Sequence, residues 1–242
     1  MRCFVLWCGP ISARTLPADL FPPGSHVLTV NEGDGGIGSS AFARLGERYG
    51  SLETLARAHR LELGDFDRVI IASFSAGWGL VEKLLQDDPT LPDVLLAADS
   101  YYTGSGLGRK PGYAALCERA ARGEALAVLS CSTIAGPGYP SSDAGLEALL
   151  APLELEPLPD PPLPYSSALP RPEETLGRAS LLWLRYGTRL EHAQHATRLA
   201  PELVRALVTP YLEGRAPPGA SPPLGPFVVA LVIVAALAAA VL

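Results

Sequence analysis

Residues 69–79 constrain the fold more than any other stretch, because an apolar run passes directly into a helical pattern. Residues 69–72 are a valine, two isoleucines and an alanine, a composition typical of a short buried strand. The residues that follow carry Val81, Leu84 and Leu85 at helical spacing. A buried strand that leads at once into a helix is the repeating unit of a parallel sheet with helices packed on its faces.

Similar apolar runs recur along the chain and alternate with helical patterns. Further strands are expected at residues 3–8, 26–30, 92–98, 125–131 and 179–187. Helices are expected at residues 39–45, 51–61 and 196–212. This alternation predicts a doubly wound, mainly parallel α/β sheet in a domain of residues 1–214. Such sheets bind ligands at the carboxyl ends of their strands.

Composition excludes several classes of protein. The formal net charge is -6, so the chain lacks a basic field that would attract nucleic acid. The cysteines show neither C-x-x-C spacing nor a neighbouring histidine cluster, so no metal site is expected. We expect reduced, buried thiols, and a disulfide stays open because the sequence does not reveal the redox compartment. The cysteines are Cys3, Cys8, Cys117 and Cys131.

The apolar run at residues 3–8 follows Arg2 and could be mistaken for a signal peptide. It stops at Gly9 and Pro10, which makes it shorter than the roughly 7–15 residues of a signal-peptide core. We therefore interpret this run as the first strand of the sheet.

Ser75 lies in the turn between the strand and the helix of residues 69–79. Ser73 and Gly77 stand two positions away on either side, and both are small. A nucleophile on a sharp strand-to-helix turn needs small residues there, because bulky side chains would collide with neighbouring elements. The stretch resembles the nucleophile elbow of the α/β-hydrolase family, with Ser73 in place of the first glycine of G-x-S-x-G. The resemblance implies a serine hydrolase in which Ser75 forms an acyl-enzyme.

The resemblance also implies an acid at the end of a later strand. Asp99 follows the strand expected at residues 92–98, where its carboxylate could accept the N–H of a histidine and fix its tautomer. The alternative role for Asp99 is to cap a turn or helix. Asp143 is the second choice, but it stands in what resembles the first turn of a helix, with Ser141 or Ser142 as N-cap.

Two histidines follow the last expected strand. The general base of the α/β-hydrolase family arrives at this point, which gives the chain order Ser, Asp, His. His192 lies nearer the strand and is the first choice. His195 lies one helical turn on and could replace it. Both could instead be solvated histidines on a helix face.

An oxyanion hole made of two backbone N–H groups is a further implication of the resemblance. One is the N–H of Ala76, directly after Ser75. The other is expected from the loop after the first strand, where Gly9 or Ile11 could supply it. Pro10, between them, has no N–H to donate.

Three aromatic residues are candidates for the substrate pocket: Trp78, Tyr101 and Tyr102. Aromatic residues at strand ends serve equally well as packing residues. The implied substrate is an ester or thioester of a small molecule or a lipid, and acyl transfer would use the same residues. No cofactor is implied.

A glycine-rich loop supports a competing interpretation. Gly33, Gly35 and Gly38 spell G-x-G-x-x-G directly after the strand expected at residues 26–30, as in dinucleotide-binding sites. Such a site needs an acid at the end of the next strand, about 20 residues on. The nearest acid, Glu53, lies in a helical stretch instead. A surface loop is therefore preferred, and a nucleotide-binding protein is kept as an alternative.

The C-terminal part changes in composition. Prolines are dense at residues 152–172, which predicts an extended surface segment. Residues 215–226 have the proline and glycine content of a linker. Residues 227–242 are uncharged and would span roughly 24 Å as a helix, against about 30 Å for the bilayer core.

We expect residues 227–242 to form a single C-terminal membrane anchor, although a buried helix of the domain is the competing interpretation. The side of the membrane stays open, with the cytoplasmic face preferred. A tethered protein could also keep the hydrolase fold without activity and act in binding or scaffolding. This is the second alternative function.

Overall fold

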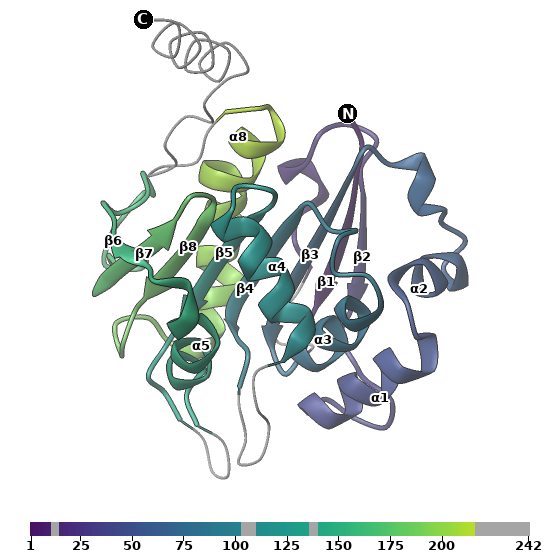
Figure 1. The fold of residues 1–242 in the computed structure, drawn as a ribbon, viewed down its shortest axis with the longest axis horizontal. Coiled ribbons are helices and arrows are strands. Elements are labelled where there is room, and N and C mark those ends of the chain that lie inside the picture. The colour runs from purple at the N-terminus through teal and green to yellow at the C-terminus, as the bar shows by residue number, and fades with distance from the viewer. Residues whose placement is uncertain (11–14, 103–109, 136–139, 216–242) are drawn as a thin grey trace, which may run out of the picture.

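The computed structural model describes residues 1–10, 15–102, 110–135 and 140–215, which contain an eight-stranded mixed sheet (Figure 1). The order of its strands is β2-β1-β3-β4-β5-β8-β7-β6. The parallel part consists of β1 (Cys3–Cys8), β2 (His26–Val30), β3 (Arg68–Ser75), β4 (Val94–Ser100), β5 (Leu126–Cys131) and β8 (Leu181–Arg185). The antiparallel strands β7 (Glu174–Arg178) and β6 (Glu156–Pro157) complete the far edge.

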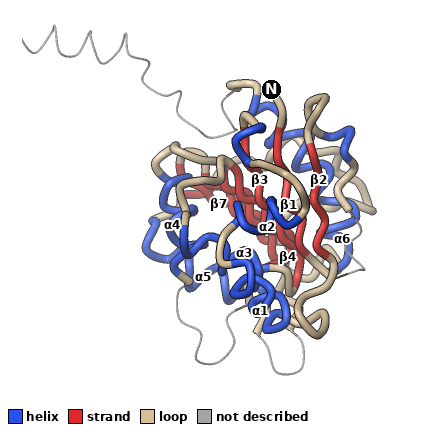
Figure 2. The backbone as a smooth tube through the Cα atoms, turned by 90° about the vertical axis from the view of Figure 1, so that its right-hand side faces the viewer, coloured by secondary structure: helices blue, strands red, loops and turns tan. Residues whose placement is uncertain are grey.

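Helices cover both faces of the sheet. Figure 2 shows α1, α3, α4 and α5 on one side and α6 on the other. The helices before β6 are α1 (Ser39–Tyr49), α2 (Leu52–Ala58), α3 (Trp78–Asp87), α4 (Pro111–Ala121) and α5 (Ser142–Leu150), with 3-10 turns at Ala18–Leu20, Leu63–Asp65 and Ala151–Leu153. The closing helix contains α6 (His192–Gln194), α7 (Ala200–Leu203) and α8 (Thr209–Leu212), joined by π turns at His195–Leu199 and Val204–Val208.

The first strand shows how the sequence builds two cores. All six residues of β1 are fully buried, and successive side chains point to opposite faces. Phe4 and Leu6 pack in the core beneath α1 to α4, whereas Val5 and Trp7 pack against the closing helix. Burying each of these large apolar side chains stabilises the fold by about 1.5–3 kcal/mol.

The closing helix contains two prolines, Pro201 and Pro210, and each lies just after a π turn. Proline has no N–H, and in an α-helix its ring collides with the carbonyl four residues earlier. The wider turns relieve this collision: the N–H of Ala200 bonds the His195 carbonyl, and that of Thr209 bonds the Val204 carbonyl. The chain therefore stays helical from His192 to Leu212.

The fold confirms the α/β class and the strands expected before residue 132. The strand expected at residues 179–187 also forms, as β8. It is one arm of an antiparallel hairpin, and the other arm, β7, was not expected from the sequence. Residues 216–242, with most of the expected linker and the whole expected anchor, lie outside the described residues. Within the described part of the chain, every helix is too short or too polar to span a bilayer.

Candidate active site

The turn at the end of β3 has the geometry of a strained strand-to-helix connection. Ser75 ends the strand with φ at 50°, a left-handed conformation that is uncommon for a residue with a side chain. Strained backbone of this kind concentrates at functional sites. A Cβ on Gly77 would lie 2.2 Å from the Cys8 carbonyl oxygen, so the turn rests directly on the end of β1. Glycine at position 77 is therefore required by close packing.

Ser73 occupies the position where the hydrolase motif has its first glycine. Its side chain is buried, and its hydroxyl bonds Ser100 Oγ at 2.9 Å and the Tyr113 hydroxyl at 2.7 Å. Ser100 Oγ also donates to the Ser75 carbonyl at 3.1 Å. The sheet thus has room for a hydroxyl group at this position, and that hydroxyl is satisfied.

Asp99 and His192 meet at the carboxyl edge of the sheet, although 93 positions separate them. The Asp99 side chain is fully buried, and its Oδ2 lies 2.6 Å from His192 Nδ1. Asp99 also accepts hydrogen bonds from the backbone N–H of Ser132 at 2.9 Å and from the hydroxyls of Ser132 and Ser142. Both carboxylate oxygens are held in place, which fixes the direction of the bond to His192.

These contacts keep Asp99 charged. Burial raises the pKa of its carboxyl, but the hydrogen bonds from His192 and Ser142 and the nearby imidazoles outweigh burial, and the pKa falls below its ordinary value. A buried carboxylate that stays ionised can orient an imidazole and stabilise its protonated form.

His192 is held beside the Ser75 turn. Its ring stacks on Phe74, the residue before Ser75, with ring centroids 4.6 Å apart. Tyr102 donates its hydroxyl hydrogen to the Asp99 carbonyl at 3.0 Å, and the same oxygen lies 3.3 Å from His192 Nδ1. Because Nδ1 faces Asp99, Nε2 is the nitrogen left for exchange with a nucleophile. The His192 side chain is 38% exposed, so solvent and substrate can reach it.

The Ser75 hydroxyl itself has no hydrogen-bond partner among the described residues. The structure therefore contains the contact between acid and base but not the contact between base and nucleophile. Catalytic hydrogen bonds are often absent without substrate and form in the complex.

The two second-choice residues have other partners. His195 is fully buried and bonds Ser130 Oγ at 3.0 Å through Nδ1, and burial lowers its pKa to about 4. Asp143 forms a two-bond ion pair with Arg185, with both N–O distances at 2.9 Å. Neither contacts the other, and Asp143 instead anchors the first turn of α5 to β8.

The structure contradicts one half of the oxyanion prediction. The N–H of Gly9 donates to the Val30 carbonyl at 3.0 Å, because pairing with the β2 side continues one residue beyond β1. Gly9 is therefore not available as an oxyanion donor, and that prediction is wrong. The N–H of Ala76 has no acceptor among the described residues. Ile11 lies outside the described residues.

A cavity of about 390 Å³ opens beside Ser75. It is lined by Pro10, Ile37, Gly38, Ser39, Ser40, Ser75, Ala76, Trp78 and Tyr102. Two of the three expected pocket residues, Trp78 and Tyr102, are among them. Tyr101 is not: it is 1% exposed and packs between Trp78 and Tyr113, so it belongs to the core.

The glycine-rich loop follows β2, which is an edge strand. Helix α1 begins directly after Gly38, as a dinucleotide site requires. Packing accounts for Gly33, however, because a Cβ there would lie 2.3 Å from the backbone of Ala41. Glu53 lies in α2 and pairs with Arg57 of the same helix.

Sequence reasoning missed Ser132 and, in its actual role, Ser142. Ser141 is the N-cap of α5, and its hydroxyl accepts the N–H of Ala144. That leaves the Ser142 hydroxyl to bond Asp99. A buried aspartate at a strand end needs hydrogen-bond donors. The serines at the start of the neighbouring loop and helix, Ser132 and Ser142, could have been recognised as such donors from the sequence.

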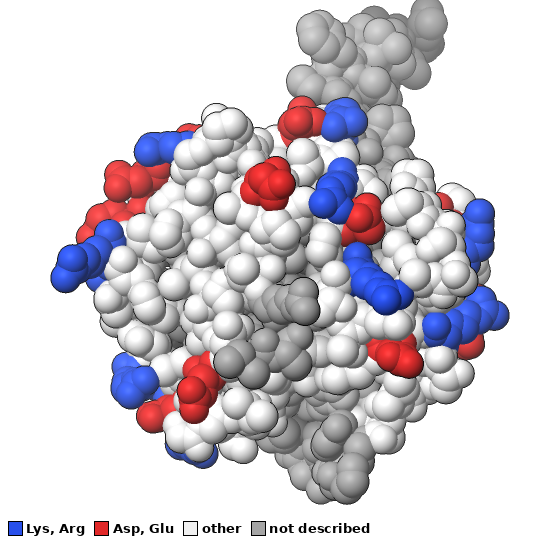
Figure 3. Space-filling view, turned by 180° about the vertical axis from the view of Figure 1, so that it is seen from behind, with Lys and Arg blue, Asp and Glu red and all other residues white. Residues whose placement is uncertain are grey.

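Several other properties bear on the site. The four cysteines are buried, and none of them is in a disulfide. On the face shown in Figure 3, acidic and basic side chains are interspersed.

The fold is α/β with a mainly parallel sheet, compatible with an α/β-hydrolase topology. No protein-family model matches the chain, and a search of curated proteins finds no match.

Proposed function

We propose that the chain is a serine hydrolase that cleaves an ester or thioester through an acyl-enzyme on Ser75. One observation carries the proposal: buried Asp99 holds His192 at 2.6 Å, and the held imidazole stacks on the residue next to Ser75. An aspartate that fixes a histidine beside a strained serine turn is the arrangement that activates a serine hydroxyl.

The order of the strands supports the same assignment. Ser75 and Asp99 lie at the carboxyl ends of the neighbouring strands β3 and β4. His192 comes after β8, which β5 separates from β4. The chain reverses its direction of winding between β1 and β3, and such switch points are the usual ligand sites of open α/β sheets. The cavity beside Ser75 lies at this switch point.

In the proposed reaction, His192 Nε2 takes the Ser75 proton as Ser75 Oγ attacks the substrate carbonyl. Asp99 stabilises the imidazolium, and the N–H of Ala76 binds the oxygen that becomes negative. His192 then gives the proton to the leaving alcohol or thiol. Water repeats the attack on the acyl-enzyme, which releases the acid and restores Ser75. Acyl transfer would replace this water by another acceptor.

The test uses the full chain, a fluorophosphonate probe and p-nitrophenyl butyrate. Wild-type protein should be labelled once and should hydrolyse the ester, whereas Ser75→Ala should lose both properties and keep its melting temperature. Ser167→Ala is the matched control and should keep both properties, because Ser167 is exposed and lines neither the cavity beside Ser75 nor its neighbour. Labelling that persists in Ser75→Ala would overturn the assignment of the nucleophile.

The unpaired Ser75 hydroxyl supports a second candidate, a binding protein that keeps this fold without catalysis. In that case wild-type protein would neither react with the probe nor hydrolyse the ester. Attachment to a membrane through residues 227–242 remains a proposal based on the sequence.

A further inference from the structure

A second cavity adjoins the one beside Ser75. It measures about 300 Å³ and is lined by Ser39, Ser40, Ala43, Trp78, Gly79, Glu82, Lys83, Gln86 and Lys110. The two cavities share Ser39, Ser40 and Trp78, so they adjoin at these residues, and we call the pair the groove. This groove extends well beyond the space that the reacting carbonyl needs beside Ser75 and the N–H of Ala76.

The middle of the groove offers hydrogen-bond donors from the start of α1. Trp78 lines the groove with its ring, but its indole N–H is buried inside the protein and presents no surface to a ligand there. Ser39 and Ser40 open the eleven-residue helix α1, whose N-cap, Gly38, supplies no side-chain acceptor. Their N–H groups are therefore available to an acceptor in the groove.

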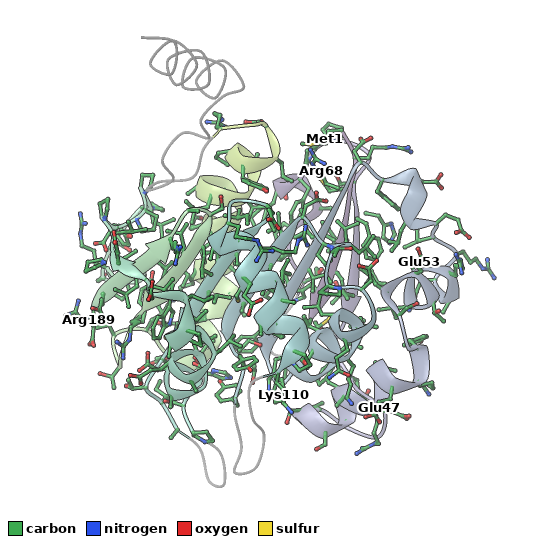
Figure 4. All side chains as sticks on the ribbon, in the orientation of Figure 1. Met1, Glu47, Glu53, Arg68, Lys110 and Arg189 are labelled. Carbon is green, nitrogen blue, oxygen red and sulfur yellow. The ribbon has the colours of Figure 1, made fainter. Side chains whose placement is uncertain are left out.

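The far end of the groove holds a cation without a carboxylate partner. Lys83 pairs with Glu47 at 2.8 Å. Glu82 is buried, and its two oxygens accept the N–H groups of Gly112 and Tyr113 at the start of α4. Lys110 forms no direct ion pair with any described residue, and its charge only partly offsets the rise that burial causes in the pKa of the Glu82 carboxyl. Figure 4 shows Lys110 and Glu47 near the same edge of the molecule.

The residue preferences of helix starts do not explain why position 110 is a lysine. It is the N-cap of α4 and forms no side-chain capping bond. Serine, threonine, asparagine and aspartate are preferred at this position, and a positive charge is unfavourable at the positive end of a helix. The amine at the mouth of the groove is therefore better explained by a ligand.

In the proposed reaction, the groove would receive the acyl group. His192 must protonate the leaving group, and it packs on Phe74 in the core beneath the closing helix. Trp78 belongs to the opposite core, beneath α1 and α3. A leaving group beside His192 therefore places the acyl group in the direction of Trp78 and Lys110.

We propose that the groove binds an acyl chain that ends in a carboxylate, with Lys110 as its partner. The substrates are then half-esters or half-thioesters of dicarboxylic acids. This inference rests on the proposed hydrolase function. Apolar atoms of the chain would contact Trp78 and Ala76, and its terminal carboxylate would balance the charge of Lys110.

The experiment compares two sets of p-nitrophenyl esters: mono-esters of dicarboxylic acids from glutarate to suberate, and their methyl-capped neutral diesters. For wild-type protein at low salt, kcat/KM should be at least tenfold higher for the best anionic ester than for its neutral match. Lys110→Gln should reduce this ratio about tenfold, and Lys110→Glu should invert it. Arg122→Gln is the control and should leave the ratio unchanged, because Arg122 pairs with Glu124 and lines neither cavity.

The outcomes separate the two proposals. Turnover of the neutral esters without preference for the anionic ones, or a ratio that Lys110→Gln does not change, overturns the carboxylate site and leaves the hydrolase standing. Absence of turnover for every ester overturns the hydrolase and the site together. The melting temperature of Lys110→Gln should not fall below that of wild type, because the change removes a positive charge from the start of α4, and this shows that any change in ratio does not come from unfolding.

Discussion

Asp99 and Asp143 are both buried carboxylates near the carboxyl edge of the sheet, yet their partners differ in kind. Asp99 is surrounded by hydroxyls, a backbone N–H and His192. Asp143 is bound by the guanidinium of Arg185, which is always charged. A carboxylate that is already neutralised has little charge left to stabilise an imidazolium. The partner, rather than burial, distinguishes a candidate catalytic acid from a structural one.

The two histidines show the same contrast within one helical turn. His192 is partly exposed and held by a carboxylate, whereas His195 is sealed in the core against Ser130. The same side chain therefore has the surroundings of a base in one case and of a packing residue in the other.

The largest expected effect comes from exchanging each acid for its amide. Asp99→Asn should lower kcat for p-nitrophenyl butyrate about 10⁴-fold, because the amide favours the wrong histidine tautomer. Asp143→Asn should change kcat less than fivefold. It should instead reduce the free energy of unfolding by about 2 kcal/mol, the worth of hydrogen bonds to a charged group.

Steady-state kinetics and urea denaturation of both variants measure these two effects. A large loss of kcat in Asp143→Asn without a loss of stability would reverse the assignment of the two acids.

The second prediction concerns His195 and the dependence of stability on pH. Its pKa is about 4 in the folded chain and about 6.5 when unfolded, so the unfolded chain binds the extra proton between these values. The stability that the neutral imidazole contributes is present above pH 6.5 and is lost as pH falls toward 4. The loss should total roughly 3 kcal/mol. Urea titrations of wild type and His195→Asn at several pH values measure it.

His195→Asn should lack this segment of the pH dependence, whatever its stability at neutral pH. Parallel curves for the variant and wild type between pH 6.5 and 4 would show that His195 is not the buried neutral group described above.

The smallest expected effect belongs to Tyr102. Tyr102→Phe removes the hydroxyl that bonds the Asp99 carbonyl and lies beside His192 Nδ1. A hydrogen bond of this kind contributes about 1 kcal/mol. We expect a roughly fivefold lower kcat, with KM for the neutral ester nearly unchanged. Tyr101→Phe is the control: its hydroxyl accepts the N–H of Lys110, so stability rather than kcat should fall. Equal effects of the two changes on kcat would remove Tyr102 from the site.

Local patterns were sufficient to predict the parallel part of the sheet. The strands β1, β3, β4 and β5 are continuous apolar runs, and Asp99 could be placed at a strand end from sequence alone. The strand β7 was not predictable, because its inward positions are Thr175 and Gly177 rather than large apolar residues.

Contacts between distant residues were beyond the reach of these patterns. The pair of Asp143 and Arg185 joins residues 42 positions apart, and the hydrogen bond that engages Gly9 depends on the register between β1 and β2. Local spacing carries no information about either contact. The expected topology did link Asp99 to His192, because the carboxyl ends of parallel strands lie at one edge of the sheet.

The hydroxyl of Ser73 has a consequence for motif searches. Its bonds to Ser100 and Tyr113 make this serine part of a small polar cluster, and glycine at the same place would remove one partner from each of these two buried hydroxyls and leave a void. A signature that demands glycine two positions before the nucleophile would therefore overlook such chains. A broader signature would admit serine there whenever a tyrosine and a second serine can close the cluster.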